Sequence, residues 1–138
     1  MKIKALLVIP NKEVQLVKIP ASNKFIEAFI GKERYQKCLD ENTILIANKN
    51  ANIDEFNRVL GNVVLLGTFL IVSIKNNRKV SMKKKDIRKF TNIFKLRKHQ
   101  KKINTYKEEF LEDYYSNQRK MKQENAKKNK ETILKLVA

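Results

Sequence analysis

The feature that most constrains the fold is an uncharged, mostly apolar run, VVLLGTFLIVSI, at residues 63–74. A helix that crosses a bilayer needs roughly 20 consecutive apolar residues, so this run is too short to span a membrane. Its residues are mainly β-branched, aliphatic or aromatic, which is typical of a strand. We therefore predict one long buried strand over 63–74, in a soluble protein that has no membrane partner.

The remainder of the first half predicts shorter strands separated by turns. KIKALLVI and EVQLVKI flank the tripeptide PNK, whose Pro and Asn have the chemistry of a hairpin turn. RYQKCL and NTILIAN predict two further strands around the acidic turn at 40–42, and the segment KNANIDEFNRVLGN predicts a polar connection after them. The Asn pair at 76–77 predicts a turn that returns RKVSM as a short edge strand.

Two helices are predicted to pack on this sheet. Ser22 can accept a hydrogen bond from a free amide at the start of the first helix, whose apolar residues recur at helical spacing until Gly31 ends it. Ser81 is the predicted N-cap of the second helix, in the segment SMKKKDIRKF. The inward stripe of the second helix is predicted to be Ile87, Phe90 and Phe94.

A change of apolar face near Lys95 predicts a break in this helical region. Leu96 and Ile103 fall nearly opposite the stripe that ends at Phe94, and one straight helix cannot bury both stripes against a single core. We therefore expect residues 83–94 to pack on the sheet. A further helix, from about 96 to 118, is expected to project from it.

Together these elements predict an α+β fold, with a mostly antiparallel sheet of five to six strands, two packed helices and a projecting C-terminal basic helix. The 138 residues suffice for one ordinary domain and an appendage. We place an α+β core domain at residues 1–95 and a helical extension of basic and mixed charge at residues 96–138.

Positive charge is concentrated in the second half of the chain. Residues 1–74 carry 10 Lys and Arg against 7 Asp and Glu, whereas residues 75–138 carry 21 against 7. Within 75–102, 13 Lys and Arg accompany Asp86 as the single acid. This excess predicts attraction to a polyanion such as nucleic acid. The alternative, in a chain rich in Lys, Asn and Ile, is that the charge serves solubility and has no partner.

The candidate nucleic-acid-binding residues are the cations of the predicted helices. Lys outnumbers Arg among them, and Lys is a point charge for phosphates, whereas Arg suits bidentate reading of bases. The predicted partner is therefore a nucleic acid or nucleoprotein, bound through its backbone with low sequence specificity. The ten candidate residues are Lys83, Lys84, Lys85, Arg88, Lys89, Lys95, Arg97, Lys98, Lys101 and Lys102.

The helix predicted from residue 96 is positive at its start and negative near its end, at Glu108, Glu109 and Glu112. A helix macrodipole favours the reverse arrangement, so local stability does not explain it. Either the basic turns face a polyanion, or two copies pair antiparallel as a homodimer through residues 96–121. The a and d positions of that segment are only partly apolar, which is a weak coiled-coil signal and is equally consistent with burial on the protein's own sheet.

The scarcity of cysteine and histidine limits the chemistry. Cys38 is the only cysteine, which excludes an internal disulfide and fits a reducing cytoplasmic compartment; we predict that its side chain is buried. His99 is the only histidine, so zinc ligands cannot cluster around histidines, and we predict that it lies on the surface. The acids of the first half are scattered, so we predict no enzyme, no catalytic residue, no metal and no cofactor.

Several segments, in order, resemble a known family. MKIKALLVIPNKEVQLVKI is followed by FIGK, ILIAN, NRVL, GTFLIV and SMKKKDIRKF. Over residues 1 to about 95 this order resembles the small domains carried by phages, plasmids and conjugative elements of Gram-positive bacteria, the family called domain of unknown function 3846. The resemblance implies the core fold, a mobile genetic element and the cytoplasm of a host bacterial cell. The resemblance does not cover the C-terminal extension.

The most specific parts of the resemblance are the tetrapeptide NRVL at 57–60 followed by GTF at 67–69, and the segment 81–90. Family members are usually acidic where this chain has Lys83, Lys84 and Lys85, so the family does not account for the basic surface. Asn57, Arg58, Gly67 and Thr68 form a possible family motif site. A buried Arg beside an Asn suits a small anion, and the structural alternative is an Arg that ties a loop to backbone carbonyls, with Gly at a bulge.

The sequence is consistent with two functions. The first is a non-catalytic accessory protein of a mobile genetic element that binds nucleic acid or nucleoprotein through its Lys-rich helical surface. The alternative is an inhibitor of a host defence nuclease, of the anti-CRISPR or anti-restriction type. Such an inhibitor would use the same Lys face for contact with a host protein.

Overall fold

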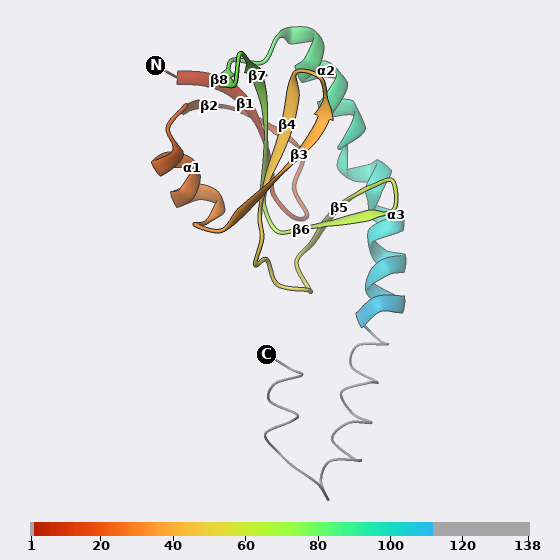
Figure 1. Cartoon of the computed structure of the whole chain (residues 1–138). Coiled ribbons are helices and arrows are strands. Elements are labelled where there is room, and N and C mark those ends of the chain that lie inside the picture. Colours follow the sequence, from red (N-terminus) through yellow and green to blue (C-terminus); the bar gives the residue numbers. More distant parts are fainter. Residues whose placement is uncertain (1, 112–138) are drawn as a thin grey trace, which may run out of the picture. The chain divides into compact units, whose positions relative to one another are not determined.

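The computed structural model describes residues 2–111 (Figure 1). A first compact unit ends at Ile103. The domain boundary at residue 95 stays a prediction. The elements are β1 (Lys2–Val8), β2 (Gln15–Pro20), α1 (Asn23–Ile30), β3 (Arg34–Asp40), β4 (Thr43–Asn48), β5 (Phe56–Leu60), β6 (Val63–Leu66), β7 (Phe69–Lys75), β8 (Arg78–Val80), α2 (Lys84–Ile93), α3 (Leu96–Tyr106) and a π-helical segment (Lys107–Leu111).

The main sheet has six strands in the order β2-β1-β7-β4-β3, with β8 also pairing with β7. Every pair is antiparallel, which confirms the predicted α+β class, strand number and strand direction. The predicted hairpin turns are also present. Asn11, Asn76 and Asn77 have φ angles of 64°, 52° and 61°, a left-handed conformation that Asn tolerates better than most residues.

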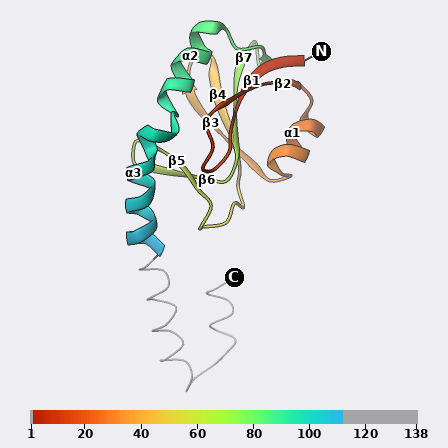
Figure 2. The same cartoon turned by 180° about the vertical axis from the view of Figure 1, so that it is seen from behind.

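The two faces of the sheet carry separate apolar cores. Ile26 and Ile30 of α1 join the core on one face, together with Ile3 and Leu70 of the sheet. Phe90 of α2 joins the core on the opposite face, with other residues of the sheet and Leu65 of β6. Figures 1 and 2 show α1 on one side of the sheet and α2 on the other. The domain therefore has three layers, with α1 on one face of the main sheet and α2 on the other, and Leu65 of β6 belongs to the core on the α2 side.

The predicted strand over 63–74 is wrong in its extent, because it divides at residues 67 and 68. β6 pairs with β5 in a separate two-stranded sheet, and β7 continues alone into the main sheet. Gly67 lies at the division with a φ angle of 69°. A Cβ atom at this position would lie 3.0 Å from the Cβ of Ala51, so both conformation and space favour glycine. The predicted polar connection is also wrong, because it contains β5.

The α1 cap follows the prediction and the α2 cap does not. Ser22 Oγ accepts a hydrogen bond from the Phe25 amide at 3.2 Å, and Gly31 ends α1. Ser81 does not cap α2, because its Oγ accepts instead from the Lys4 amide of β1 at 2.9 Å. Lys83 occupies the N-cap position without a side-chain hydrogen bond. The start of α2 is thus fixed by the link between residue 81 and the sheet.

The break predicted near Lys95 is confirmed, because α2 ends at Ile93 and α3 begins at Leu96. Phe90 and Phe94 are buried and Ile87 is half-buried, as the predicted inward stripe requires. Residues 112–118 of the predicted helix 96–118 lie outside the described residues. That this helix projects from the domain stays a prediction.

Candidate nucleic-acid interface

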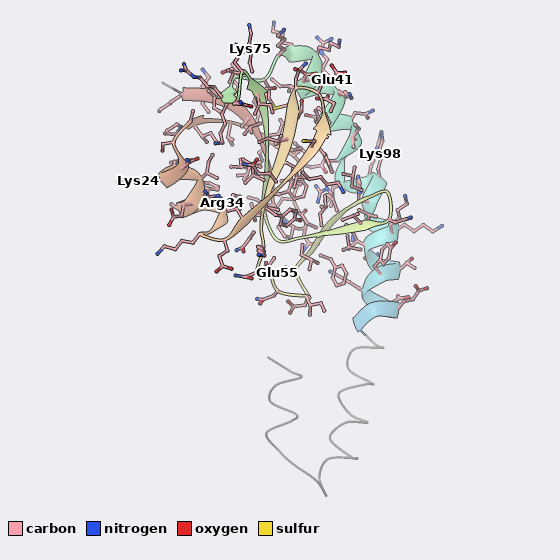
Figure 3. All side chains as sticks on the ribbon, in the orientation of Figure 1. Lys24, Arg34, Glu41, Glu55, Lys75 and Lys98 are labelled. Carbon is pink, nitrogen blue, oxygen red and sulfur yellow. The ribbon has the colours of Figure 1, made fainter. Side chains whose placement is uncertain are left out.

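The outward faces of α2 and α3 carry the candidate cations. In α2 the inward positions recur every three or four residues, which leaves 84, 85, 88 and 89 facing solvent. In α3 the inward positions are 96, 99 and 103, which leaves 97, 98, 101 and 102 outside. Nine of the ten candidates are exposed, and Lys95, between the two helices, is half-buried. Figure 3 shows Lys98 on this side of the molecule and Lys75 near the β7–β8 turn.

Little of this charge is neutralised by the described residues. Lys89 forms an ion pair with Asp40, at 3.3 Å between Nζ and Oδ2. Lys98 Nζ donates to Asn92 Oδ1 at 2.8 Å, which leaves its charge in place. Within residues 2–111, Lys84 and Arg88 form no ion pair at all. The two helices therefore present a cationic face to solvent, on which the charges of Lys84 and Arg88 have no acidic partner within residues 2–111.

Arg58 of β5 holds the junction between these helices, although it is fully buried at 0% exposure. Its Nε donates to the Phe94 carbonyl at 2.7 Å, at the end of α2. Its Nη2 donates to the Lys12 carbonyl at 2.6 Å, and its Nη1 donates to both the carbonyl and Oδ1 of Asn57, at 3.1 and 2.8 Å. Burial lowers the pKa of the guanidinium, whereas the Glu13 carboxylate raises it. One cation thus links three chain segments.

Asn57, Gly67 and Thr68 are grouped with Arg58 in the sequence, and Asn57 is bonded to it directly. Asn57 Nδ2 donates to the Val8 carbonyl at 2.9 Å and to the Gly67 carbonyl at 2.7 Å. Thr68 is half-buried beside Gly67. This geometry matches the structural alternative for the motif, because the donors of Asn57 and Arg58 are directed to protein carbonyls.

His99 provides a second link, and the prediction of a surface histidine is wrong. Its side chain is only 7% exposed. Nδ1 accepts a hydrogen bond from the Val59 amide at 3.2 Å, Nε2 lies 2.6 Å from the Ile93 carbonyl, and the ring stacks on Phe94. The spacing of Leu96, His99 and Ile103 on one helical face is the sequence signal that would have placed His99 inside.

The neighbours of His99 favour a neutral ring with its proton on Nε2. Nδ1 must stay unprotonated to accept from the Val59 amide, and Nε2–H can then donate to the Ile93 carbonyl. Burial lowers the pKa of His99, and the positive charges of Arg58, Lys102 and Lys98 lower it further, against an opposing effect of the Ile93 carbonyl. Protonation therefore opposes the docking of α3 on β5.

We expect this histidine to make stability depend on pH. Because its folded pKa lies below the unfolded value of about 6.5, its contribution is complete above pH 6.5 and is lost as the pH falls through the folded pKa. Urea unfolding of the wild type and of a His99→Asn variant at pH 7.5 and pH 5 measures the effect. The wild type should lose more unfolding free energy than the variant. Equal losses would mean that His99 does not carry the dependence.

Two other predictions depend on side-chain position. Cys38 is exposed, so the prediction of a buried thiol is wrong; β3 is an edge strand of the sheet, where fewer neighbours cover a side chain. Ile103 is buried against the protein's own residues. This agrees with burial on the protein's own domain, which is the alternative to a coiled-coil contact between two copies. The homodimer through 96–121 stays a prediction, and residues 112–121 lie outside the described part of the chain.

The comparisons with known proteins assign no family. No family model, no curated protein and no solved structure matches this chain. Among residues 2–111, no helix is long and apolar enough to cross a membrane. In the same range, no three His, Cys, Asp or Glu side chains gather in a way that could hold a metal ion.

Proposed function

We propose that this protein binds nucleic acid or nucleoprotein phosphates through the cationic face of α2 and α3, as a non-catalytic accessory protein of a mobile genetic element. The observation that carries the proposal is the arrangement of eight exposed Lys and Arg side chains on two consecutive helices, with a ninth, Lys83, at the N-cap of α2. Among these cations, Lys89 is paired with Asp40. The mobile-element setting rests on the resemblance of residues 1 to about 95.

The location of the charge supports a specific surface over a general solubility effect. Residues 75–102 hold 13 Lys and Arg against one acid, whereas residues 103–138 hold 8 against 6. The first 74 residues are likewise close to balance. A charge that served solubility alone would have no reason to gather on two neighbouring helices.

The contacts at the junction support this role because they fix the two helices relative to the core. Arg58 bonds the end of α2, and Glu13 Oε1 accepts from the Leu96 amide at the start of α3, at 3.2 Å. Side chains on fixed elements lose less freedom on binding than side chains on mobile loops. Lys ammonium groups on such a face neutralise phosphates and release counterions without reading bases.

The test is a fluorescence-anisotropy titration of the full chain with random-sequence single- and double-stranded DNA and RNA, at 50 and 200 mM salt. Contact with about six phosphates should lower the affinity roughly 1,000-fold between the two salt concentrations. An affinity that is independent of salt, or no binding at 50 mM, would contradict the proposal. A host protein would then become the first partner to seek.

A further inference from the structure

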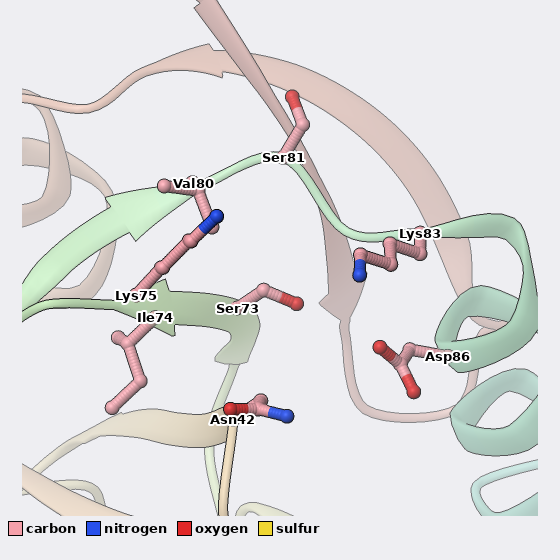
Figure 4. Close-up of a pocket in the computed structure, with 8 residues that line it drawn as sticks. All are labelled: Asn42, Ser73, Ile74, Lys75, Val80, Ser81, Lys83 and Asp86. Atoms are coloured by element: carbon pink, nitrogen blue, oxygen red, sulfur yellow. The ribbon is translucent and has the colours of Figure 1, made fainter.

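A pocket of about 210 Å³ opens where β7, the β8–α2 link and the start of α2 meet. Figure 4 shows the side chains of Asn42, Ser73 and Asp86 directed toward the same space, with Lys83 beside them. Ile74 and Val80 supply aliphatic surface to its lining. Sites for drug-sized ligands usually measure roughly 300–1,000 Å³, so this pocket suits a single ring system.

Ser73 contributes to the pocket a buried hydroxyl without a hydrogen-bond partner in residues 2–111, which favours a polar ligand. Its side chain is only 5% exposed, and its Oγ has no hydrogen-bond partner within the described residues. Ser73 lies directly across from Thr43 in the pairing of β4 and β7, and its hydroxyl is the one that lines the pocket. Most buried hydroxyls in folded proteins are hydrogen-bonded, so the unpaired Ser73 hydroxyl needs an explanation.

The charges of the pocket select the class of ligand. Asp86 forms no ion pair with any described residue, and its carboxylate would repel a free anion. Lys83 would in turn repel a metal ion. A neutral group that offers N–H donors to Asp86 and both donors and acceptors to Ser73 and Asn42 satisfies these three side chains.

The edge of a nucleobase is such a group, and it would arrive attached to phosphates that Lys75 and Lys83 can contact. Guanine presents two adjacent N–H donors on its Watson–Crick edge, which match the two oxygens of one carboxylate. That edge is free only in an unpaired base. Lys83 and Asp86 line the pocket, and Lys84 and Lys85 of the cationic face lie between them in the chain.

We infer that the pocket accepts one unpaired guanine from a single strand that lies along α2, with Asp86 accepting from its Watson–Crick edge and Ser73 and Asn42 completing the hydrogen bonds. This inference rests on the proposed function. It adds a preference for one base at one position to a surface that otherwise contacts phosphates.

The experiment compares two labelled 12-nucleotide DNA strands, one of thymine alone and one with a single central guanine. The wild-type chain should bind the second about tenfold more tightly, as one bidentate base contact allows. Asp86→Asn should reduce this ratio to near one, although it raises the net charge. Asp54→Asn, which makes the same charge change at an exposed site, should leave the ratio unchanged. Ser73→Ala should lower the ratio without loss of thermal stability.

The outcomes separate the two proposals. Equal, salt-sensitive affinity for both strands would overturn the guanine site and would leave the proposed phosphate-binding face intact. The hydroxyl of Ser73 would then be satisfied by water only. A ratio that survives Asp86→Asn would also overturn the site. Absence of binding to either strand would overturn the proposed function, and the guanine site with it.

Discussion

Replacing Arg58 with Met should lower the free energy of unfolding by about 3–5 kcal/mol, the usual cost of removing one member of a buried, hydrogen-bonded charged network. The side chain is fully buried, and its loss would leave the carbonyls of Lys12, Phe94 and Asn57 without their donors. Each such orphaned group costs about 1–3 kcal/mol. Urea denaturation followed by circular dichroism measures the change.

The matched control is Arg34→Met. Arg34 is half-buried and makes one hydrogen bond, from Nη1 to the Gly31 carbonyl at 2.9 Å. Its replacement should cost no more than about 1.5 kcal/mol, the usual net worth of one hydrogen bond. Arg58→Lys should recover little of the lost stability. The planar guanidinium of Arg donates to three separate carbonyl groups, whereas the compact ammonium group of Lys cannot reach all three. Equal stability of the Arg58→Met variant and the wild type would show that the network does not hold the junction.

The elements that the sequence predicts well are those in which burial follows a simple period. The stripe of Ile87, Phe90 and Phe94 repeats every three or four residues, and both its helix and the break after it are where the sequence places them. The turns at Asn11 and at residues 76–77 are equally local, because Asn tolerates the left-handed conformation that they require.

The elements that were missed are those in which buried positions are polar. β5 contains Asn57 and Arg58, both fully buried, so its pattern resembles that of an exposed connection. The division of the 63–74 run at Gly67 depends on contacts with Ala51 and with the Glu55 carbonyl, which accepts from the Gly67 amide at 2.7 Å. No local pattern contains these long-range contacts, so periodicity alone could not have shown them.

The same distinction applies to the candidate site. The cations of α2 and α3 could be named from the sequence because exposure on a helix follows from spacing. The pocket could not, because Asn42, Ser73 and Asp86 are far apart in the chain and Ser73 lies inside an apolar strand. An unpaired hydroxyl becomes visible only when the surrounding elements are in place.

Reversal of three charges on the cationic face should abolish most of the affinity for nucleic acid. Lys84, Arg88 and Lys102 are exposed and form no ion pair with the described residues, so their replacement by Glu removes three phosphate contacts and adds three repulsive charges. The affinity at 50 mM salt should fall at least about 100-fold, and the slope of log affinity against log salt should decrease by about three. Glu at the first turn of α2 suits the helix macrodipole, so folding should persist.

The control for that variant changes the net charge equally on a different surface. The three residues to replace are the exposed Lys24, Lys32 and Lys49. Lys24 lies on α1 and Lys32 follows that helix. Lys49 is near Lys32, because its backbone amide donates to the carbonyl of Glu33. Replacing these three with Glu should lower the affinity by less than about tenfold, because distant charges are screened beyond roughly 8–10 Å at ordinary salt. If both triple variants lose affinity equally, net charge drives binding and the α2–α3 face has no special part in it. If only the first loses affinity, the phosphates lie along α2 and α3.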